Sequence, residues 1–260
     1  MSKPKMILKY TGAKWRIADW IISKMPKHHS YVEPFFGSGA VFFNKKPSAI
    51  ETINDLDEDI VNLFSIVRDN ADALAEAISL TPYSRQEYDN AFKKNPADRV
   101  EKARLFLIKC WQGHGFRNIT THRSGWKNDV QGREAAYAVR NWYRLPQWIE
   151  QAVERLREVQ IEHCNAIDLI ERFNYENVLI YADPPYVLST RGGKNYNHEM
   201  SDSEHIALLE RLLKHKGSVI LSGYESYLYA EYLSHWDKYS IDNLAEKGLK
   251  RVETIWVKER

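Results

Sequence analysis

The run Asp183-Pro184-Pro185-Tyr186 follows a dense apolar stretch at residues 177–182, which is typical of a central strand in a parallel sheet. Proline fixes its own backbone angle and has no N–H. The two prolines therefore leave a rigid edge of acceptors, made of backbone carbonyls and the Asp183 carboxylate. This edge suits a planar ring that carries an NH2 group. The amine can donate to Asp183 and to the Pro184 carbonyl while Tyr186 stacks on the ring.

A second group of residues begins at Glu33, directly after an expected strand at residues 30–32. In the run 33–39, Gly37 and Gly39 let backbone amides approach a ligand at the carboxyl end of that strand. Phe42 stands where the third glycine of a dinucleotide fingerprint belongs, so a pyrophosphate site is disfavoured. A plain tight turn before a packed helix also explains the glycine pair.

Asp55 ends the next expected strand, at residues 49–54. A carboxylate at that position can accept hydrogen bonds from ribose hydroxyls.

The third motif is the N-terminal loop Lys9-Tyr10-Thr11-Gly12-Ala13-Lys14-Trp15, which precedes an expected helix at residues 15–25. A flexible arm or a helix cap is the alternative reading of this loop.

The three motifs, in the order N-terminal loop, glycine loop and Asp-Pro-Pro-Tyr, together resemble those of the Dam-type DNA adenine-N6 methyltransferases. The resemblance covers residues 9–191, and residues 253–258 are similar to the closing strand of that family. It implies S-adenosylmethionine as the cofactor, and transfer of its methyl group to N6 of a flipped-out adenine in DNA. Tyr186 would stack on that adenine, and Asp183 with the Pro184 carbonyl would hold its amine.

The resemblance also implies two sets of site residues. The expected catalytic residues are Asp183, Pro184, Pro185 and Tyr186. The expected cofactor-binding residues are Tyr10 (where relatives often have Trp), Lys14, Glu33, Pro34, Phe35, Gly37, Gly39, Asp55, Asn165 and Asp183. Because the ring face does the stacking, we expect Tyr186→Phe to keep most of the activity and Tyr186→Ala to lose it.

Positive charge is concentrated between residues 104 and 144, where eight basic residues stand against two acidic ones, so this stretch carries +6 in a chain of net charge +2. Trp111, Trp126, Trp142 and other aromatic residues are interleaved with the cations, and such a surface suits a polyanion with stackable bases. A solvated helical face over core aromatics is the alternative. The residues expected to contact DNA are Arg117, Asn118, Arg123, Lys127, Asn128, Arg133 and Arg191.

The periodicity indicates an α/β chain of 260 residues, with helices from about residue 71 to residue 157 between two strand-bearing parts. We therefore expect a Rossmann-like S-adenosylmethionine-dependent methyltransferase sheet with an inserted helical DNA-recognition domain. The expected parts are 1–69 and 159–260 for the catalytic domain and 70–158 for the insertion. Capping boxes begin helices at Ser84 and Ser201, the latter helix ending at Gly217, and Pro146 is expected to open a helix.

Composition narrows the class of protein. Hydrophobic residues make up 43% of the chain, as in globular domains, and the only cysteines, Cys110 and Cys164, favour free thiols in a reducing compartment. No stretch has the apolar length of a membrane span or a signal peptide, and no histidine or acidic cluster suggests a metal. We therefore expect a cytoplasmic enzyme without a metal.

The expected partner is double-stranded DNA, and the chain is expected to be a monomer or a weak dimer. No nuclease-like second domain fits into this length, so any partner restriction endonuclease would be a separate chain. Two other functions stay open at this point. One is methylation of adenine in RNA or of a protein Gln amide, and the other is a non-catalytic nucleic-acid-binding protein.

Overall fold

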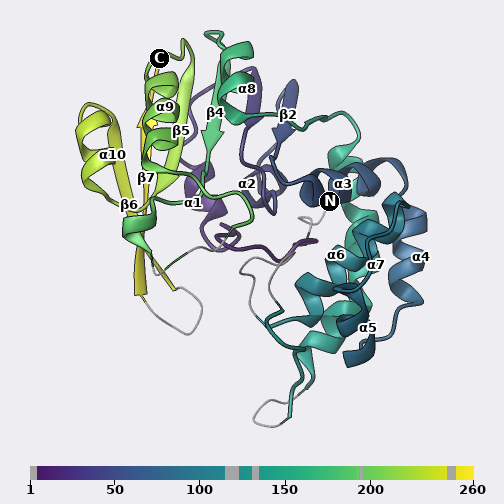
Figure 1. Cartoon of the computed structure of the whole chain (residues 1–260). Helices are drawn as coiled ribbons and strands as arrows, with labels where there is room; N and C mark the ends of the chain where they lie inside the picture. Colours follow the sequence, from purple (N-terminus) through teal and green to yellow (C-terminus); the bar gives the residue numbers. More distant parts are fainter. Residues whose placement is uncertain (1–4, 115–122, 131–134, 192, 194–195, 245–249) are drawn as a thin grey trace. The chain divides into compact units, whose positions relative to one another are not determined.

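The computed structural model describes residues 5–114, 123–130, 135–191, 193, 196–244 and 250–260 (Figure 1). The chain forms two compact units. The sheet unit consists of residues 14–56, 158–194 and 198–260, and the helical unit consists of residues 1–13, 57–157 and 195–197. The domain boundaries expected from the sequence, after residues 69 and 158, stay a prediction.

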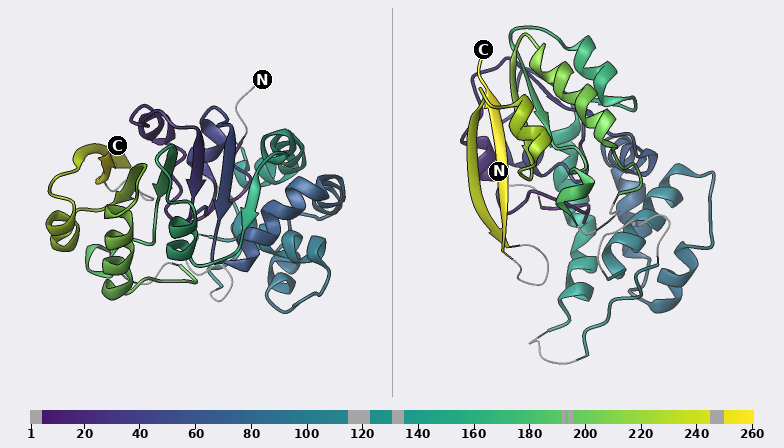
Figure 2. Two further views of the ribbon diagram at one scale, coloured as in Figure 1. Left: turned by 90° about the horizontal axis from the view of Figure 1, so that it is seen from above. Right: turned by 60° about the vertical axis from the view of Figure 1, so that its left-hand side comes forward.

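The described strands of the sheet unit form one mixed seven-stranded sheet in the order β3-β2-β1-β4-β5-β7-β6. The strands are β1 (Ser30–Glu33), β2 (Ile50–Asn54), β3 (Gln160–Glu162), β4 (Val178–Ala182), β5 (Ser218–Gly223), β6 (Asp237–Leu244) and β7 (Lys250–Lys258). The first five run parallel, whereas β7 is antiparallel to both of its neighbours. The expected α/β fold is therefore confirmed, and β6 and β7 pair at one edge of the sheet, seen in Figure 2.

The order of the parallel strands explains where a ligand can bind. From β1 the chain continues outward to β2 and β3, and it then returns to β4 and β5 on the other side. The order reverses between β1 and β4, and open α/β sheets bind ligands beyond the carboxyl ends of strands at such a point. Glu33 ends β1 and Asp183 follows β4, so both acidic residues lie at this reversal.

Helices on one face of the sheet bury its apolar core. They are α8 (Ala166–Arg172), α9 (Asp202–Leu213) and α10 (Tyr227–Tyr232). Their side chains, among them Leu169, Leu208 and Tyr229, pack with Ile180 of β4 and Val219 of β5. The sheet unit also contains two short helices, α1 (Ala18–Ile22) and α2 (Ala40–Asn44), and the short 3-10 turn η1 (Leu188–Thr190).

The helical unit is built from α3 (Glu58–Asp69), α4 (Ala71–Ser79), α5 (Arg85–Ala91), α6 (Arg99–Gln112) and α7 (Tyr137–Leu156). Two buried tryptophans tie it together through their ring N–H groups. Trp111 donates to the Ile7 carbonyl at 2.7 Å, and Trp142 donates to the Thr81 carbonyl at 2.8 Å. The first of these bonds fastens the N-terminal segment to α6.

One expected helix start is wrong. Pro146 lies inside α7, which begins at Tyr137. Proline lacks the N–H that bonds to the preceding turn, so a helix rarely passes through it unless packing holds both halves. Here the buried side chains of Trp142, Leu145 and Ile149 continue one apolar stripe across the proline, and this burial outweighs the lost bond.

The capping predictions differ in outcome. Ser201 and Glu204 form the complete expected box at the start of α9, although this helix ends at Leu213 rather than at Gly217. Ser84 accepts from the Glu87 N–H, but the Glu87 carboxylate pairs with Arg104 instead of completing the box. No helix among the described residues is both long and apolar enough to cross a membrane.

Candidate active site

The run Asp183 to Tyr186 leaves the sheet directly after β4, whose five residues are all buried. The Asp183 side chain is 18% exposed and forms an ion pair, its Oδ2 lying 2.9 Å from Nζ of Lys14. The other oxygen, Oδ1, is buried and has no hydrogen-bond partner among the described residues. A buried acceptor in this state is matched by a ligand that brings an N–H or O–H donor.

Two opposing effects act on the charge of Asp183. Burial raises the pKa of its carboxyl group, while the Lys14 ammonium lowers it. The nearby Glu253 carboxylate raises the pKa further, by like-charge repulsion. The net effect is a raised pKa, and Lys14, whose side chain is only 5% exposed, is the main group that opposes this rise and favours the ionised form of Asp183.

Tyr186 is buried and is held by groups from other parts of the sheet unit. Its hydroxyl donates to Oε2 of Glu253 at 2.7 Å. Its ring meets the Tyr224 ring edge to face, with 4.5 Å between centroids and 72° between planes. Nζ of Lys14 lies 4.8 Å from the Tyr186 ring centroid. Burial raises the pKa of the Tyr186 hydroxyl well above its ordinary value, so it stays a neutral donor.

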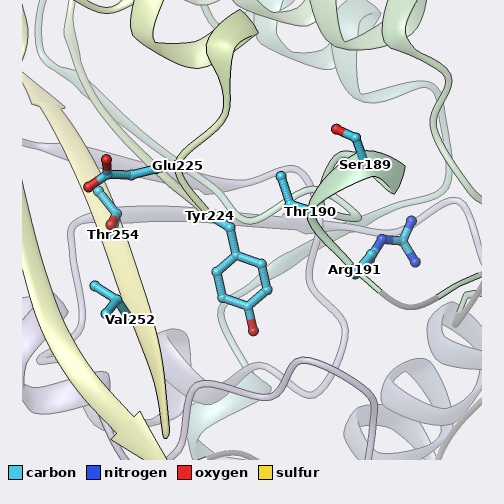
Figure 3. A pocket seen from close by; sticks show the side chains of 7 residues that line it. All are labelled: Ser189, Thr190, Arg191, Tyr224, Glu225, Val252 and Thr254. Atoms are coloured by element: carbon cyan, nitrogen blue, oxygen red, sulfur yellow. The ribbon is translucent and has the colours of Figure 1, made fainter.

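A cavity of about 590 Å³ is lined in part by Tyr224 (Figure 3). This volume falls in the range of small-molecule sites, about 300–1,000 Å³. Tyr224 stands between η1 and β7 in this view. The lining residues are Ser189, Thr190, Arg191, Tyr224, Glu225, Val252 and Thr254.

The glycine loop is shaped by the residues that flank it. Gly37 and Gly39 have φ values of 51° and 65°, a region that favours glycine. A Cβ added at Gly39 would lie 2.5 Å from the Phe36 ring, so only glycine fits there without a shift. The Gly37 N–H donates to Oδ2 of Asp55 at 2.8 Å, and this bond ties the loop to the end of β2.

Glu33 is 2% exposed and accepts the Tyr31 hydroxyl at 2.7 Å. Asn54, which the sequence did not single out, connects three segments at this edge. Its amide donates to the carbonyls of Pro34 and Cys164, and its side-chain oxygen accepts the Cys164 N–H. Asn54 therefore sets the path of the loop that begins at Pro34.

The remaining residues expected at the cofactor lie in different environments. Asn165 is exposed, and its side chain caps α8 by accepting the Ile167 N–H at 2.8 Å. Phe35 packs against the sheet core from its edge. Tyr10 belongs to the helical unit, where its ring centroid lies 6.1 Å from that of Tyr196. A role of these residues in cofactor binding stays a prediction.

Three of the residues expected at DNA, Arg117, Asn118 and Arg133, lie outside the described residues. Of the others, Arg123 is exposed and pairs with Asp89, and Asn128 is exposed.

Lys127 is half-buried, and its backbone bonds to Gln112 and Tyr83. These contacts hold the described part of the loop after α6 against the helical unit. Contact of any of these residues with DNA stays a prediction.

Arg191 has a different environment from the other cations. Its side chain is 4% exposed, and it pairs with Glu199 and donates to the Tyr186 carbonyl at 2.6 Å. These contacts hold the segment after Tyr186 in place, so Arg191 shapes the site through the protein. Its expected contact with DNA stays a prediction.

Sequence reasoning missed Glu253 and Tyr224 as site residues, and it did not anticipate the ion pair between Lys14 and Asp183. The expected contact of Lys14 with the cofactor stays a prediction. A signal for Glu253 was present. Residues 253, 255 and 257 share one face of a strand, and Glu253 is the only one of them that is not apolar. Nothing local pointed to Tyr224. Within the described ranges, no group of three or more His, Cys, Asp or Glu side chains could hold a metal ion.

Several solved structures resemble the chain weakly. An rRNA methylase from Streptococcus thermophilus has a TM-score of 0.40 at 8% identity, covering 94% of each chain. A putative methyltransferase from Streptococcus mutans, solved with SAH, has a TM-score of 0.41 at 8% identity, covering 93% of this chain and 95% of that one. Likeness at this level carries no weight for function.

Sequence comparison is more specific. The chain is 27% identical to the DNA N-6-adenine-methyltransferase of Escherichia phage P1, over 80% of this chain but 28% of that protein. It is 25% identical to the type II methyltransferase M.MjaIII of Methanocaldococcus jannaschii, over 84% of this chain and 83% of that one. It is 28% identical to the DNA adenine methylase of Haemophilus influenzae, over 71% and 66%. Residues 10–251 match the model of one family, so this chain belongs to the D12 class of N6 adenine-specific DNA methyltransferases.

Proposed function

We propose that this DNA adenine methyltransferase acts on an adenine flipped out of double-stranded DNA, and that Asp183 and Tyr186 receive the base. The observation that carries the proposal is the buried Oδ1 of Asp183, which has no hydrogen-bond partner among the described residues and lies in the same short run as Tyr186. An adenine amine supplies the missing donor, and the adenine ring supplies a face for stacking.

The residues of the sheet unit fit S-adenosylmethionine, the cofactor of this family. Gly37 and Gly39 give the loop its positive-φ path, and the Asp55 carboxylate is already oriented by the Gly37 N–H. Residues 33–39 would form a wall of the cofactor site, and Asp55 would accept the ribose hydroxyls. When bound, the cofactor supplies a methyl group on a positively charged sulfur.

Energetics favour extrusion of the base into this site. Removing a base from the stack costs a few kcal/mol. Stacking on an aromatic ring returns about 1–3 kcal/mol, so Tyr186 offsets a large part of that cost. The cavity lined by Tyr224, whose ring meets that of Tyr186, provides room for part of the extruded nucleotide.

Asp183 then acts on the amine itself. The lone pair of an adenine amine is delocalised into the ring, which makes the amine a poor nucleophile. Acceptors at Asp183 Oδ1 and the Pro184 carbonyl favour the pyramidal amine, and they stabilise the positive charge that develops on nitrogen. The transfer forms the N6–methyl bond as the bond between the methyl group and sulfur breaks, which leaves the sulfur neutral. One amine proton is lost to water, and no covalent enzyme intermediate forms.

The test is methyl transfer from tritiated S-adenosylmethionine to unmethylated genomic DNA, followed by single-molecule sequencing that maps N6-methyladenine. We expect modification confined to one short motif. Scattered modification would contradict sequence-specific recognition but not the chemistry. Label in RNA or protein instead of DNA would contradict the proposed substrate, and cofactor binding without any transfer would favour the non-catalytic binder.

We further propose that the enzyme works in the cytoplasm as a monomer or weak dimer. The free thiols of Cys110 and Cys164 support a reducing compartment. Size-exclusion chromatography with light scattering, at concentrations spanning those of the activity assay, tests the oligomeric state. A stable higher oligomer would contradict it.

A further inference from the structure

The far end of the Tyr186 ring is bound to a carboxylate on another strand. Tyr186 Oη donates to Oε2 of Glu253 at 2.7 Å, and the two side chains belong to residues that are 6% and 8% exposed. A hydrogen bond to a charged acceptor is about twice as strong as a neutral one. The contact joins the turn after β4 to β7, 67 residues away in the chain.

Glu253 is directed at Tyr186 by the alternation of its strand. Val252 and Thr254 line the cavity beside Tyr224, so the side chain between them points to the opposite face of β7. In β7, Glu253 is paired with Ile241 of β6, and the residues that follow it, 254–258, pair with β5, so its position in the sheet is fixed. A carboxylate buried in this way needs a donor, and the Tyr186 hydroxyl is one.

The plane of the Tyr186 ring matters for stacking. The hydroxyl bond holds the ring at its tip, and the edge-to-face contact with Tyr224 holds it from the side. A ring fixed before the base arrives avoids the cost of ordering it at each capture. Without the bond to Glu253, the ring can turn away from the plane that meets the adenine.

We propose that Glu253 is a positioning residue for methyl transfer, and that it acts by holding the Tyr186 ring in the plane that stacks on the extruded adenine. The proposal rests on the proposed function, because Tyr186 is the residue that receives the base. It also changes an expectation from the sequence. Tyr186→Phe keeps the ring face but leaves a buried carboxylate unpaired, so this variant loses base capture.

The test compares Tyr186→Phe, Glu253→Met, Glu253→Gln and the double variant Tyr186→Phe/Glu253→Met. Base capture is followed by the fluorescence of 2-aminopurine at the target position of a duplex that carries the mapped motif, and turnover is followed in parallel. Glu253→Gln keeps an oxygen that accepts the hydroxyl, and we expect near-normal capture. For Glu253→Met and Tyr186→Phe, we expect capture and kcat to fall about tenfold or more, the scale of a lost hydrogen bond to a charged group.

The double variant separates positioning from a role in folding. Replacing both partners by apolar groups removes the unpaired buried atom, so the thermal unfolding temperature recovers toward that of the wild type. Capture stays low, since no bond fixes the ring. If the double variant instead regains wild-type capture, the bond serves stability only and the proposal is overturned. Wild-type behaviour of Glu253→Met would overturn it as well.

Two controls complete the experiment. Asp242→Asn removes an exposed carboxylate from the neighbouring strand β6, and we expect it to leave capture and turnover unchanged. DNA affinity stays constant in all variants, because phosphate contacts dominate it. If the wild-type chain neither methylates DNA nor alters the fluorescence, the proposed function is contradicted. If the wild type is active and Glu253→Met is equally active, only the role of Glu253 is contradicted.

Discussion

The two oxygens of the Asp183 carboxylate lie in different environments. Oδ2 is paired with Lys14, and Oδ1 is buried without a hydrogen-bond partner in the described part of the chain. The ion pair favours the charged carboxylate in a place where burial raises its pKa and favours the neutral form. The chemistry of the site thus depends on a lysine as much as on the motif that contains Asp183.

Replacing Asp183 by Asn tests this division. The amide has the size of the carboxylate but neither its charge nor its second strong acceptor. We expect kcat to fall by about two orders of magnitude or more, the scale seen when one charge-stabilising group is removed from an active site. Methyl-transfer assays at saturating DNA and cofactor measure the loss, and thermal unfolding checks that the variant is folded. Near-normal turnover would contradict the catalytic role of Asp183.

Replacing Lys14 by Met tests the electrostatic role of the lysine. The transfer needs ionised Asp183, so the rate falls as the pH drops through the pKa of this carboxyl group. Lys14 lowers that pKa, and its removal raises it. We therefore expect the acid limb of the kcat profile to move to higher pH in Lys14→Met.

The conservative variant and a matched control sharpen this test. Lys14→Arg retains the positive charge and should leave the acid limb close to its wild-type position. Lys24, which lies over the Tyr239 ring in the same unit, provides the control Lys24→Met. An acid limb at the same pH in Lys14→Met and Lys24→Met would show that Lys14 does not set the charge of Asp183.

At the scale of elements, the N-terminal segment is held against α6 by contacts that place the charged Lys9 side chain in a largely buried position. Nζ of Lys9 lies 3.8 Å from the Trp111 ring centroid, and the Trp111 N–H bonds to the Ile7 carbonyl. Burial, together with the positive charge of Lys127, lowers the pKa of Lys9 from 10.5 to about 8. The folded helical unit therefore holds this proton less tightly than the unfolded chain does.

The pH dependence of stability follows from this shift. Between about pH 8 and the ordinary lysine pKa, the unfolded chain binds more protons at Lys9, so this residue makes the free energy of unfolding rise with pH. We expect Lys9→Met to reduce that rise. Urea unfolding across this pH range measures it, with the exposed Lys93→Met as control. Equal slopes in the wild type and Lys9→Met would contradict the shifted pKa.

At the scale of the whole molecule, the uneven charge distribution predicts which surface the enzyme turns to DNA. The stretch 104–144 carries +6, and its last part forms the first half of α7. Arg140, Arg144, Tyr137 and Tyr143 are all exposed there. Cations beside exposed rings match a phosphate backbone, and neutralised phosphates release counterions.

The double variant Arg140→Gln/Arg144→Gln tests this surface. If both side chains contact phosphate, the slope of log affinity against log salt decreases by about 0.9 for each lost contact. Fluorescence anisotropy with a labelled duplex, over a series of salt concentrations, gives the slope. Arg157→Gln/Arg260→Gln removes two exposed charges that already pair with acidic neighbours, and we expect its slope to match that of the wild type. The same slope in both double variants would contradict phosphate contact by α7.

Much of the sheet unit was predictable because its signals are local. A short apolar run predicts each of three strands: β4, the strand that leads to Glu33 and the strand before Asp55. Pro146 was misjudged because a proline inside α7 is tolerated only when tertiary packing holds the helix on both sides. The order of the strands in the sheet has no comparable local mark.

The sequence by itself determined which chemical groups are present. They are an acceptor-rich Asp-Pro-Pro-Tyr edge after a buried strand, a glycine loop, and the Asp55 carboxylate, which is expected to accept ribose hydroxyls. The order of the motifs resembles that of one family. The tertiary structure decided what surrounds these groups. Lys14 reaches Asp183, and Glu253 and Tyr224 reach Tyr186, because strand pairing and the turns after β4 and β5 bring distant segments together. Such contacts leave no local sequence pattern, because each residue is compatible with its own strand or turn whether or not its partner is present.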